Sequence, residues 1–347
     1  MPRPGPGPLN LITDVAGLKV GQAEDAATRS GVTVIVAEGR AVCAVDVRGG
    51  APGTRETDAL APENLVDEAD AIVLSGGSVY GLAAADGVTA VLGAAGQGYG
   101  LSRATGGPRA SGVPVAPIVP AAILYDLANG GDKGWSEAPP YRALGMAALR
   151  RAGREFRLGT AGAGYGAMAG RLKGGLGSTS AVSEAGFTVG AIVAVNSFGA
   201  AVAPGGRSFW AAPYEVDGEF GGLGSAGLAA APDDWGLAKG PAPGGRVNTT
   251  IACVATDAAL TPAEAKRFAI MAQDGLARAL RPAHSPFDGD VVFALATGQL
   301  AVDGPRLQTV ARLGALAADC LARAIARGVY EATTWPGTAV TCWRDLD

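Results

Sequence analysis

The sequence predicts an α/β fold, and two stretches of the chain support this class. The apolar run 71–74 (AIVL) leads into a glycine-rich segment, 75–81 (SGGSVYG), and then into a helix-like run over 82–92. Nearer the C-terminus, the β-branched run 249–256 (TTIACVAT) is followed by a helix start at 261–264 (TPAE), with threonine as the N-cap and proline at the first helical position. Strand, turn and helix therefore follow one another in both places, as in α/β proteins.

The remaining elements are expected in chain order. Two strands over 31–37 and 41–47 are separated by 38–40 (EGR), which predicts a hairpin. The uncharged span 185–204 is long enough to cross a bilayer, but its glycines and β-branched residues indicate a buried strand, a turn and a second strand. Further expected elements are a helix over 142–154, a helix from 261 to about 280, a strand over 291–297, a long amphipathic helix over 306–327 and a last strand over 340–343.

Composition excludes several classes of function. The 347 residues carry a net charge of −4 and no basic runs, which argues against nucleic acid or an anionic membrane as the main partner. The four cysteines lack CxxC spacing, and Cys43 and Cys253 lie in apolar runs, so we expect small core residues and a reduced, cytoplasmic setting. The start, MPRPGPGP, has no apolar signal core, so we expect no secretory signal. His284 is the only histidine, which rules out a zinc site built from several histidines, and we interpret it as a surface or structural residue.

Three glycine-rich stretches have both a structural and a functional interpretation. The loop 48–55 and the segment 75–81 could hold an anion through backbone amides, or they could simply be tight turns. The loop 48–55 matches no nucleotide-binding glycine motif, and a tight loop is the favoured interpretation of it. The stretch 161–178 is the richest in glycine and contains Lys173, so it is either a flexible loop or backbone held close to another group.

The peptide bond between Asn248 and Thr249 joins a loop to a strand. Residues 236–245 are mostly Gly, Pro and Ala with one charge, Lys239, whereas the residues from Thr249 onward are typical of a strand. Composition alone favours an ordinary linker that enters a core strand. The alternative is self-cleavage, in which the threonine hydroxyl attacks the carbonyl before it and frees Thr249 as a new N-terminus. A terminal amine, with a pKa of about 7.7–8, would then supply the base that an internal threonine lacks.

The order of short motifs along the chain resembles one family, the L-aminopeptidase/D-esterase family, which includes the β-peptidyl aminopeptidases and the nylon-oligomer hydrolases. The resemblance covers nearly the whole chain. The motifs that carry it are NLITDVAGLKVG from Asn10, VDVRGGAPGTRETD from Val45, LSGGSVYGLAAADGV from Leu74, PAAILYDL from Pro120, LKGGLGS from Leu172, AVNSFG from Ala194, NTTIACVATDA from Asn248 and DGDVVFALAT from Asp288.

The resemblance implies a four-layer α/β/β/α sandwich, similar in mechanism to N-terminal nucleophile hydrolases but with different connectivity. It implies one domain over 1–347 that cleaves itself into an α chain, 1–248, and a β chain, 249–347. It also implies tetramers of processed αβ units and a reaction that needs no metal or organic cofactor. For the bond between Asn248 and Thr249, the resemblance reverses the preference that composition gave, and cleavage becomes the favoured hypothesis.

The resemblance also assigns candidate site residues. They are Thr249 as the nucleophile, Asn196 as an oxyanion donor, Tyr125 beside the substrate, Lys173 as a charge near the nucleophile, and Asp288 and Asp290 in contact with the nucleophile. The β-aminopeptidases have a serine and an acid at the last two positions, whereas this chain has two acids, as do the nylon-oligomer hydrolases, which also use threonine. For Lys173, a purely structural role is an equally good interpretation.

Three functional hypotheses follow. The first is a self-processed amidohydrolase that removes N-terminal residues from peptides or small amides through an acyl-enzyme. The second is acyl transfer to an amine instead of water, as in the ornithine acetyltransferases. The third is a non-catalytic α/β protein that binds a ligand with the loops around Gly76 or Gly164.

Overall fold

A computed structural model describes residues 5–100, 112–226, 228–229, 233–240 and 248–346. Its strands are β1 (Leu18–Asp25), β2 (Ser30–Val47), β3 (Thr54–Arg55), β4 (Glu68–Ser75), β5 (Ala121–Ile123), β6 (Met168–Ala169), β7 (Leu172–Lys173), β8 (Leu176–Val182), β9 (Thr188–Asn196), β10 (Thr249–Ala258) and β11 (Val291–Leu300). Its α-helices are α1 (Ala83–Ala94), α3 (Tyr141–Arg150), α4 (Pro262–Ala272), α5 (Asp274–Ala279) and α6 (Arg306–Tyr330). Among the described helices, none combines the length and the apolar character needed to cross a membrane.

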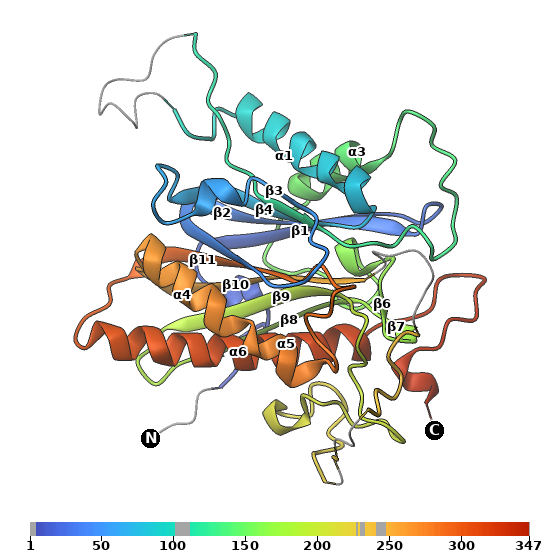
Figure 1. Cartoon of the computed structure of the whole chain (residues 1–347). Helices are drawn as coiled ribbons and strands as arrows, with labels where there is room; N and C mark the ends of the chain where they lie inside the picture. Colours follow the sequence, from blue (N-terminus) through green and yellow to red (C-terminus); the bar gives the residue numbers. More distant parts are fainter. Residues whose placement is uncertain (1–4, 101–111, 227, 230–232, 241–247, 347) are drawn as a thin grey trace.

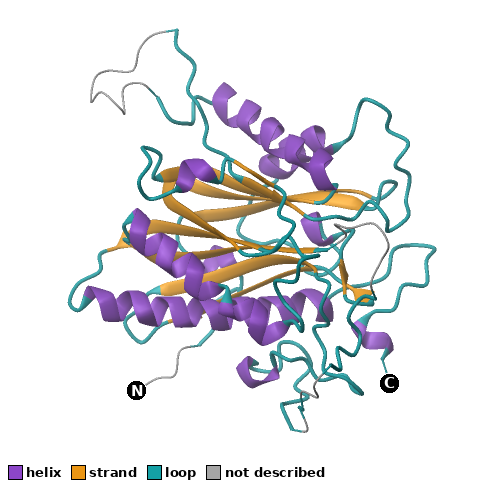
Figure 2. Ribbon diagram, viewed as in Figure 1, coloured by secondary structure: helices purple, strands orange, loops and turns teal. Residues whose placement is uncertain are grey.

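The elements stack in four layers, as Figures 1 and 2 show. Helices α1 and α3 cover one layer of strands, and α4, α5 and α6 cover the other. The hydrogen-bonded order is β3-β5-β4-β2-β11-β10-β9-β8, with β1 paired to β2, so β2 belongs to both strand layers. The pairing is mixed: β10 runs parallel to β11 and antiparallel to β9. The expected α/β/β/α sandwich is therefore confirmed.

Three apolar cores separate the four layers. The middle core lies between the strand layers and includes Ile35, Ile251 and Phe293. The two outer cores lie beneath the helices. Strand β10 shows how the sequence specifies this arrangement, because Ile251 faces the middle core while its neighbour Ala252 faces the core beneath α4 and α6. Successive residues of a strand point to opposite faces, so a strand buried on both sides is apolar throughout.

The predicted hairpin over 31–47 is wrong, because these residues form the single long strand β2. The first part of β2 pairs with β1 across the turn at 26–29, and the last part pairs with β11. Gly39 has a φ of +92°, and the register against β4 shifts between Val36 and Ala41. The segment 38–40 is therefore an irregularity within a strand, because each half of the strand has a different neighbour to pair with.

Several other boundaries also differ from the predictions. The segment 199–204 forms only isolated bridges instead of a second strand, and 340–342 form no strand before a short 3₁₀-helix, Trp343–Asp345. The indole of Trp343 stacks on Phe209, with ring centroids 5.4 Å apart, so packing and not sheet pairing holds this end of the described chain. The helix from Thr261 has the predicted capping box but breaks at Gln273, whose side chain donates to the carbonyl of Asp46 at 2.8 Å.

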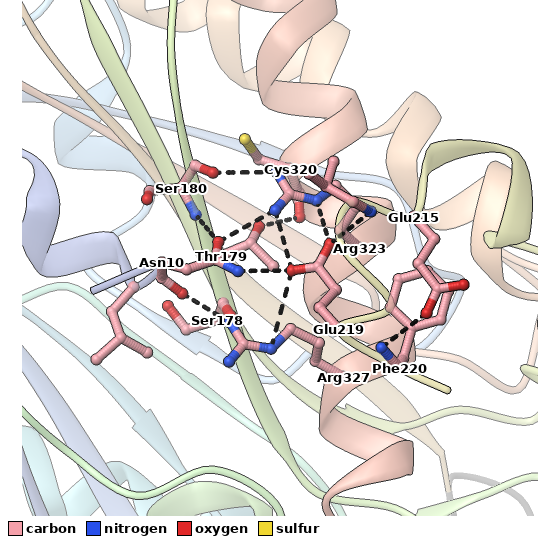
Figure 3. Close-up of polar contacts among 12 residues, drawn as sticks. Asn10, Ser178, Thr179, Ser180, Glu215, Glu219, Phe220, Cys320, Arg323 and Arg327 are labelled. Atoms are coloured by element: carbon pink, nitrogen blue, oxygen red, sulfur yellow. Dashed lines mark hydrogen bonds and ion pairs between the residues drawn. The ribbon is translucent and has the colours of Figure 1, made fainter. Parts of the chain in front are cut away.

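A buried ion-pair network ties α6 to segments far away in sequence (Figure 3). The Arg323 guanidinium donates two hydrogen bonds to the carboxylate of Glu219 and one, at 3.0 Å, to the carbonyl of Ser180 in β8. The side chain of Asn10 also donates to Glu219, at 2.6 Å. Only 4% of the Arg323 side chain and 7% of the Glu219 side chain are exposed. The network therefore links the N-terminal segment, β8 and α6. It lies on the α6 side of the strand layer that holds β8, β9, β10 and β11, which is the lower strand layer in Figure 1.

Candidate active site

Thr249 is the first residue of β10, in the centre of the lower strand layer. Its side chain is buried, and its hydroxyl donates to the carbonyl oxygen of Asn248. The antiparallel pairing of β10 with β9 sets Thr249 directly opposite Asn196, the last residue of β9. Residues 236–240 of the glycine-rich linker are described, and 241–247 lie outside the described residues. Sheet register therefore brings together two residues that are 53 positions apart in the sequence.

The side-chain amide of Asn196 is fixed at both ends. Its Nδ2 donates to the carbonyl of Tyr125 at 2.9 Å, and its Oδ1 accepts from the Met168 N–H at 2.9 Å. Only 2% of Asn196 is exposed. The amide is therefore oriented before any substrate binds.

The two aspartates lie in the segment just before β11, where that strand runs parallel to β10. Asp290 accepts the Thr250 N–H through Oδ1 at 2.9 Å, so it holds the residue next to Thr249. Asp288 accepts the Phe198 N–H at 2.9 Å and the Ser285 hydroxyl. Both carboxylates are buried.

Burial and the negative charge of Asp290 raise the pKa of Asp288 to about 6, and the positive charge of Lys239 acts in the opposite direction. At neutral pH the two acids are thus an interacting pair in which Asp288 takes up a proton at a higher pH than a free carboxyl does.

A small pocket opens beside Thr249. Its volume is about 110 Å³, and Asn248, Thr249, Tyr125 and Ile123 form part of its wall. The remaining wall residues are Ala51, Pro52, Gly53, Ser78, Val79 and Leu82. Two of the glycine-rich loops, 48–55 and 75–81, thus contribute to the wall of this pocket. A larger hollow of about 310 Å³, between the β8–β9 turn and α6, shares no residue with it.

The Thr249 hydroxyl also depends on a residue that cannot carry a side chain. A Cβ built on Gly289 would lie 2.8 Å from Oγ1 of Thr249 and 2.6 Å from the carbonyl oxygen of Ala51. Both distances are shorter than carbon atoms tolerate in proteins. Glycine is therefore required at the point where the segment that carries Asp288 and Asp290 passes the Thr249 hydroxyl.

Lys173 lies behind the site and not in the pocket. Its side chain is fully buried and donates to three carbonyl oxygens, those of Gly164, Ala167 and Gly174. Its ammonium also lies 4.9 Å from the centre of the Trp335 ring. Burial lowers the pKa of Lys173 to about 7. The lysine secures the glycine-rich loop whose Met168 N–H orients Asn196.

Sequence reasoning overlooked two residues in this cluster. Lys239 was counted only as the single charge of a linker, yet its ammonium lies 3.4 Å from the carbonyl oxygen of Asn196. Burial lowers the pKa of Lys239 to about 7, and the charge of Asp288 opposes this effect. His284 is partly exposed, in keeping with the expected surface or structural residue, and its ring nitrogen Nδ1 lies 2.9 Å from Oδ2 of Asp290. No motif marked either residue, although His284 lies only four residues before the DGD motif.

Comparison with solved structures defines the class of fold. A β-aminopeptidase from Burkholderia sp. superposes with a TM-score of 0.67 at 23% identity, covering 100% of this chain and 92% of that one. The L-aminopeptidase D-Ala-esterase/amidase from Ochrobactrum anthropi superposes with a TM-score of 0.65 at 21% identity, covering 97% of this chain and 90% of that one. The latter is described as a variant of the N-terminal nucleophile hydrolase fold. The present chain has this fold.

Sequence comparison then gives the family. The model of Peptidase family S58 matches residues 10–342, and the chain belongs to this family. A Mycobacterium tuberculosis protein named as an uncharacterized aminopeptidase is 44% identical over 361 residues, covering 97% of this chain and 98% of the relative. A 6-aminohexanoate-oligomer endohydrolase from Paenarthrobacter ureafaciens is 29% identical over 300 residues, covering 84% and 76%. The resemblance drawn from the sequence is confirmed, and the chain is an aminopeptidase or amidohydrolase of this family.

Proposed function

We propose that the chain cleaves itself between Asn248 and Thr249 and then hydrolyses peptides or small amides with Thr249 as an N-terminal nucleophile. The observation that supports this most directly is the position of Thr249. It begins a central strand, its hydroxyl contacts the carbonyl of the preceding residue, and it forms part of the wall of a pocket.

Self-cleavage is an exchange of an amide for an ester, followed by hydrolysis. Oγ1 of Thr249 attacks the carbonyl carbon of Asn248, the C–N bond breaks, and the proton of the hydroxyl goes to the departing amine. Water then cleaves the ester, which leaves a carboxylate on Asn248 and a free amine on Thr249. The hydroxyl contact with the Asn248 carbonyl group supports this first step, because the reacting groups are neighbours before the reaction.

Turnover uses the same atoms on an external amide. The new amine of Thr249 accepts the proton of Oγ1 as that oxygen attacks the substrate carbonyl, and it returns the proton to the leaving amine. Water hydrolyses the resulting acyl-enzyme. Asn196 lies opposite Thr249 and supplies the oriented amide that would stabilise the oxyanion, while Tyr125 lines the pocket beside it.

The charged residues have separate roles in this scheme. Asp290 holds the strand at Thr250, and the Asp288–Asp290 pair provides carboxylate charge near the amine that cleavage would create. Lys173 acts at a distance by holding the loop that orients Asn196.

The sheet order supports the continued association of the two chains after cleavage. Strands β10 and β11 of the β chain lie between β9 and β2 of the α chain and are hydrogen-bonded to both. Separation would break the centre of a continuous sheet, so we propose that the αβ unit remains one domain. The family resemblance further suggests that these units form tetramers.

The function is tested with a panel of amides. L-alanyl and β-alanyl anilides and 6-aminohexanoate oligomers are incubated with the wild type and with Thr249→Ala. Hydrolysis by the wild type alone, with an acyl adduct on the 249–347 fragment, would support the proposal. Transfer of the acyl group to an added amine in preference to water would favour an acyltransferase. An uncut chain without any adduct would instead favour a ligand-binding protein.

A further inference from the structure

The single histidine of the chain is joined through one carboxylate to Thr250, the neighbour of the proposed nucleophile. Oδ2 of Asp290 accepts the backbone N–H of His284 at 2.9 Å and lies 2.9 Å from the ring nitrogen Nδ1. The other oxygen, Oδ1, accepts the N–H of Thr250 at 2.9 Å. One carboxylate therefore connects His284 to the residue that follows Thr249.

The backbone of His284 is held in an unusual conformation that favours this contact. Its φ is +54°, in the left-handed region that few residues other than glycine adopt, although histidine is among those found there more often than most. In this conformation both the backbone N–H and the ring of the same residue reach one oxygen of Asp290. The cost of that backbone conformation is offset by contacts to a single buried acceptor.

The other face of His284 is accessible. About 23% of its side chain is exposed, and it borders an open cavity of about 460 Å³ together with Trp210, Arg278 and Arg281. Asp290, by contrast, is only 1% exposed. The histidine therefore separates a buried carboxylate from the surface.

We propose that His284 is a positioning residue, which holds the Asp290 carboxylate against the start of β10 and thereby fixes Thr249 for attack. This inference rests on the proposed function of Thr249. It adds a residue to the site that neither the family motifs nor the conventional interpretation of a lone histidine indicated.

Charged groups from several elements surround this cluster and enter any pH response. Asp288 lies on the same segment as Asp290, and Lys239 comes from the segment before the cleavage site. Arg278 and Arg281 border the cavity beside His284. None of these four residues is altered in the test below, so each contributes equally to all the variants.

Two substitutions test the side-chain donor of His284. His284→Asn keeps a side-chain N–H near the position of Nδ1, does not titrate, and tolerates a positive φ. His284→Gly also tolerates the backbone but has no side chain. Asp217→Gly is the matched control, because Asp217 is an exposed residue with a φ of +52° outside the site. Self-cleavage is followed by mass spectrometry, and kcat/KM is measured from pH 5 to 9.

We expect His284→Gly to slow both self-cleavage and turnover by about 10-fold or more, the effect of losing one hydrogen bond to a charged group. His284→Asn should stay within about 3-fold of the wild type because it restores the donor, and Asp217→Gly should match the wild type in rate and profile.

Other results would overturn the inference. If His284→Gly only lowers the melting temperature and leaves the rates of self-cleavage and turnover unchanged, the histidine is structural. If His284→Asn is as slow as His284→Gly, the restored donor is not what the site requires. A wild-type chain that stays uncut and inactive would instead refute the proposed function itself, which is a separate outcome.

Discussion

Replacement of Asn196 by alanine tests whether the oriented amide opposite Thr249 stabilises the transition state. The substitution removes the amide that donates to Tyr125 and accepts from Met168, each at 2.9 Å. If this amide supports an oxyanion, its loss lowers kcat by about 10²–10³-fold, which corresponds to about 2.7–4 kcal/mol of transition-state stabilisation.

Asn196→Ala should also lower the free energy of unfolding, and the size of this loss follows from the two hydrogen bonds that the side chain makes. The carbonyl of Tyr125 and the N–H of Met168 both lose a partner, at about 1–3 kcal/mol for each buried group left unpaired. The free energy of unfolding should therefore fall by roughly 2–6 kcal/mol. Two quantities are measured for this reason: kcat at a temperature where the variant is folded, and the free energy of unfolding from denaturant titration.

Asn129→Ala is the matched control for stability. The side-chain amide of Asn129 donates to the carbonyls of Arg29 and Gly166, each at 2.9 Å. Its loss should lower stability by a comparable amount and leave kcat close to that of the wild type. If both variants are equally destabilised and equally active, Asn196 orients the loop but does not act on the oxyanion, and the reasoning is refuted.

Three further substitutions test other parts of the structure. Glu219→Gln leaves the Arg323 guanidinium buried without its counter-ion and should reduce the free energy of unfolding by about 3–5 kcal/mol. Glu38→Gln, which removes one partner of an exposed ion pair, should change the free energy of unfolding much less. Equal effects of the two substitutions would refute the stabilising role of the buried network. Burial raises the pKa of Asp126 to about 6, so this carboxyl contributes stability that is full below its ordinary pKa of 3.8 and is lost as the pH rises through 6. Relative to Asp126→Asn, the wild type should therefore lose about 3 kcal/mol between pH 3 and pH 7 in chemical denaturation, and a constant difference would contradict the assigned pKa. Gly289→Ala places a methyl group 2.8 Å from Oγ1 of Thr249 and should abolish self-cleavage while the protein stays folded, as followed by mass spectrometry and circular dichroism. Rapid cleavage of this variant would show that the segment shifts at little cost and that glycine is not required there.

The elements with strong local signals could be predicted from the sequence. The run from Thr249 is β-branched and bounded by a turn, and it forms β10, while the capping box at Thr261 starts α4 as predicted. The continuous strand β2 could not be recognised, because Gly39 is typical of a turn and only the pairing of each half with a different strand makes it part of a strand. Local sequence carries no information about such distant partners.

In the candidate site, too, some residues could be predicted from sequence motifs, whereas others are placed only by the tertiary structure. The family motifs indicated Thr249, Asn196 and the two aspartates, and the register of β9 against β10 explains why two of these residues face each other. The positions of Lys239 and His284 depend on how two irregular segments cross the sheet ends. Neither segment has a period or a spacing from which that crossing could be inferred.

The most direct test of the central claim is the intact mass of the purified protein beside that of Thr249→Ala, followed by N-terminal sequencing. The wild-type chain of 34.3 kDa should separate into two fragments, the smaller of which begins with Thr249, while the variant stays whole. A wild-type chain that remains a single mass after long incubation, like its variant, would contradict the account and leave Thr249 as an ordinary strand residue.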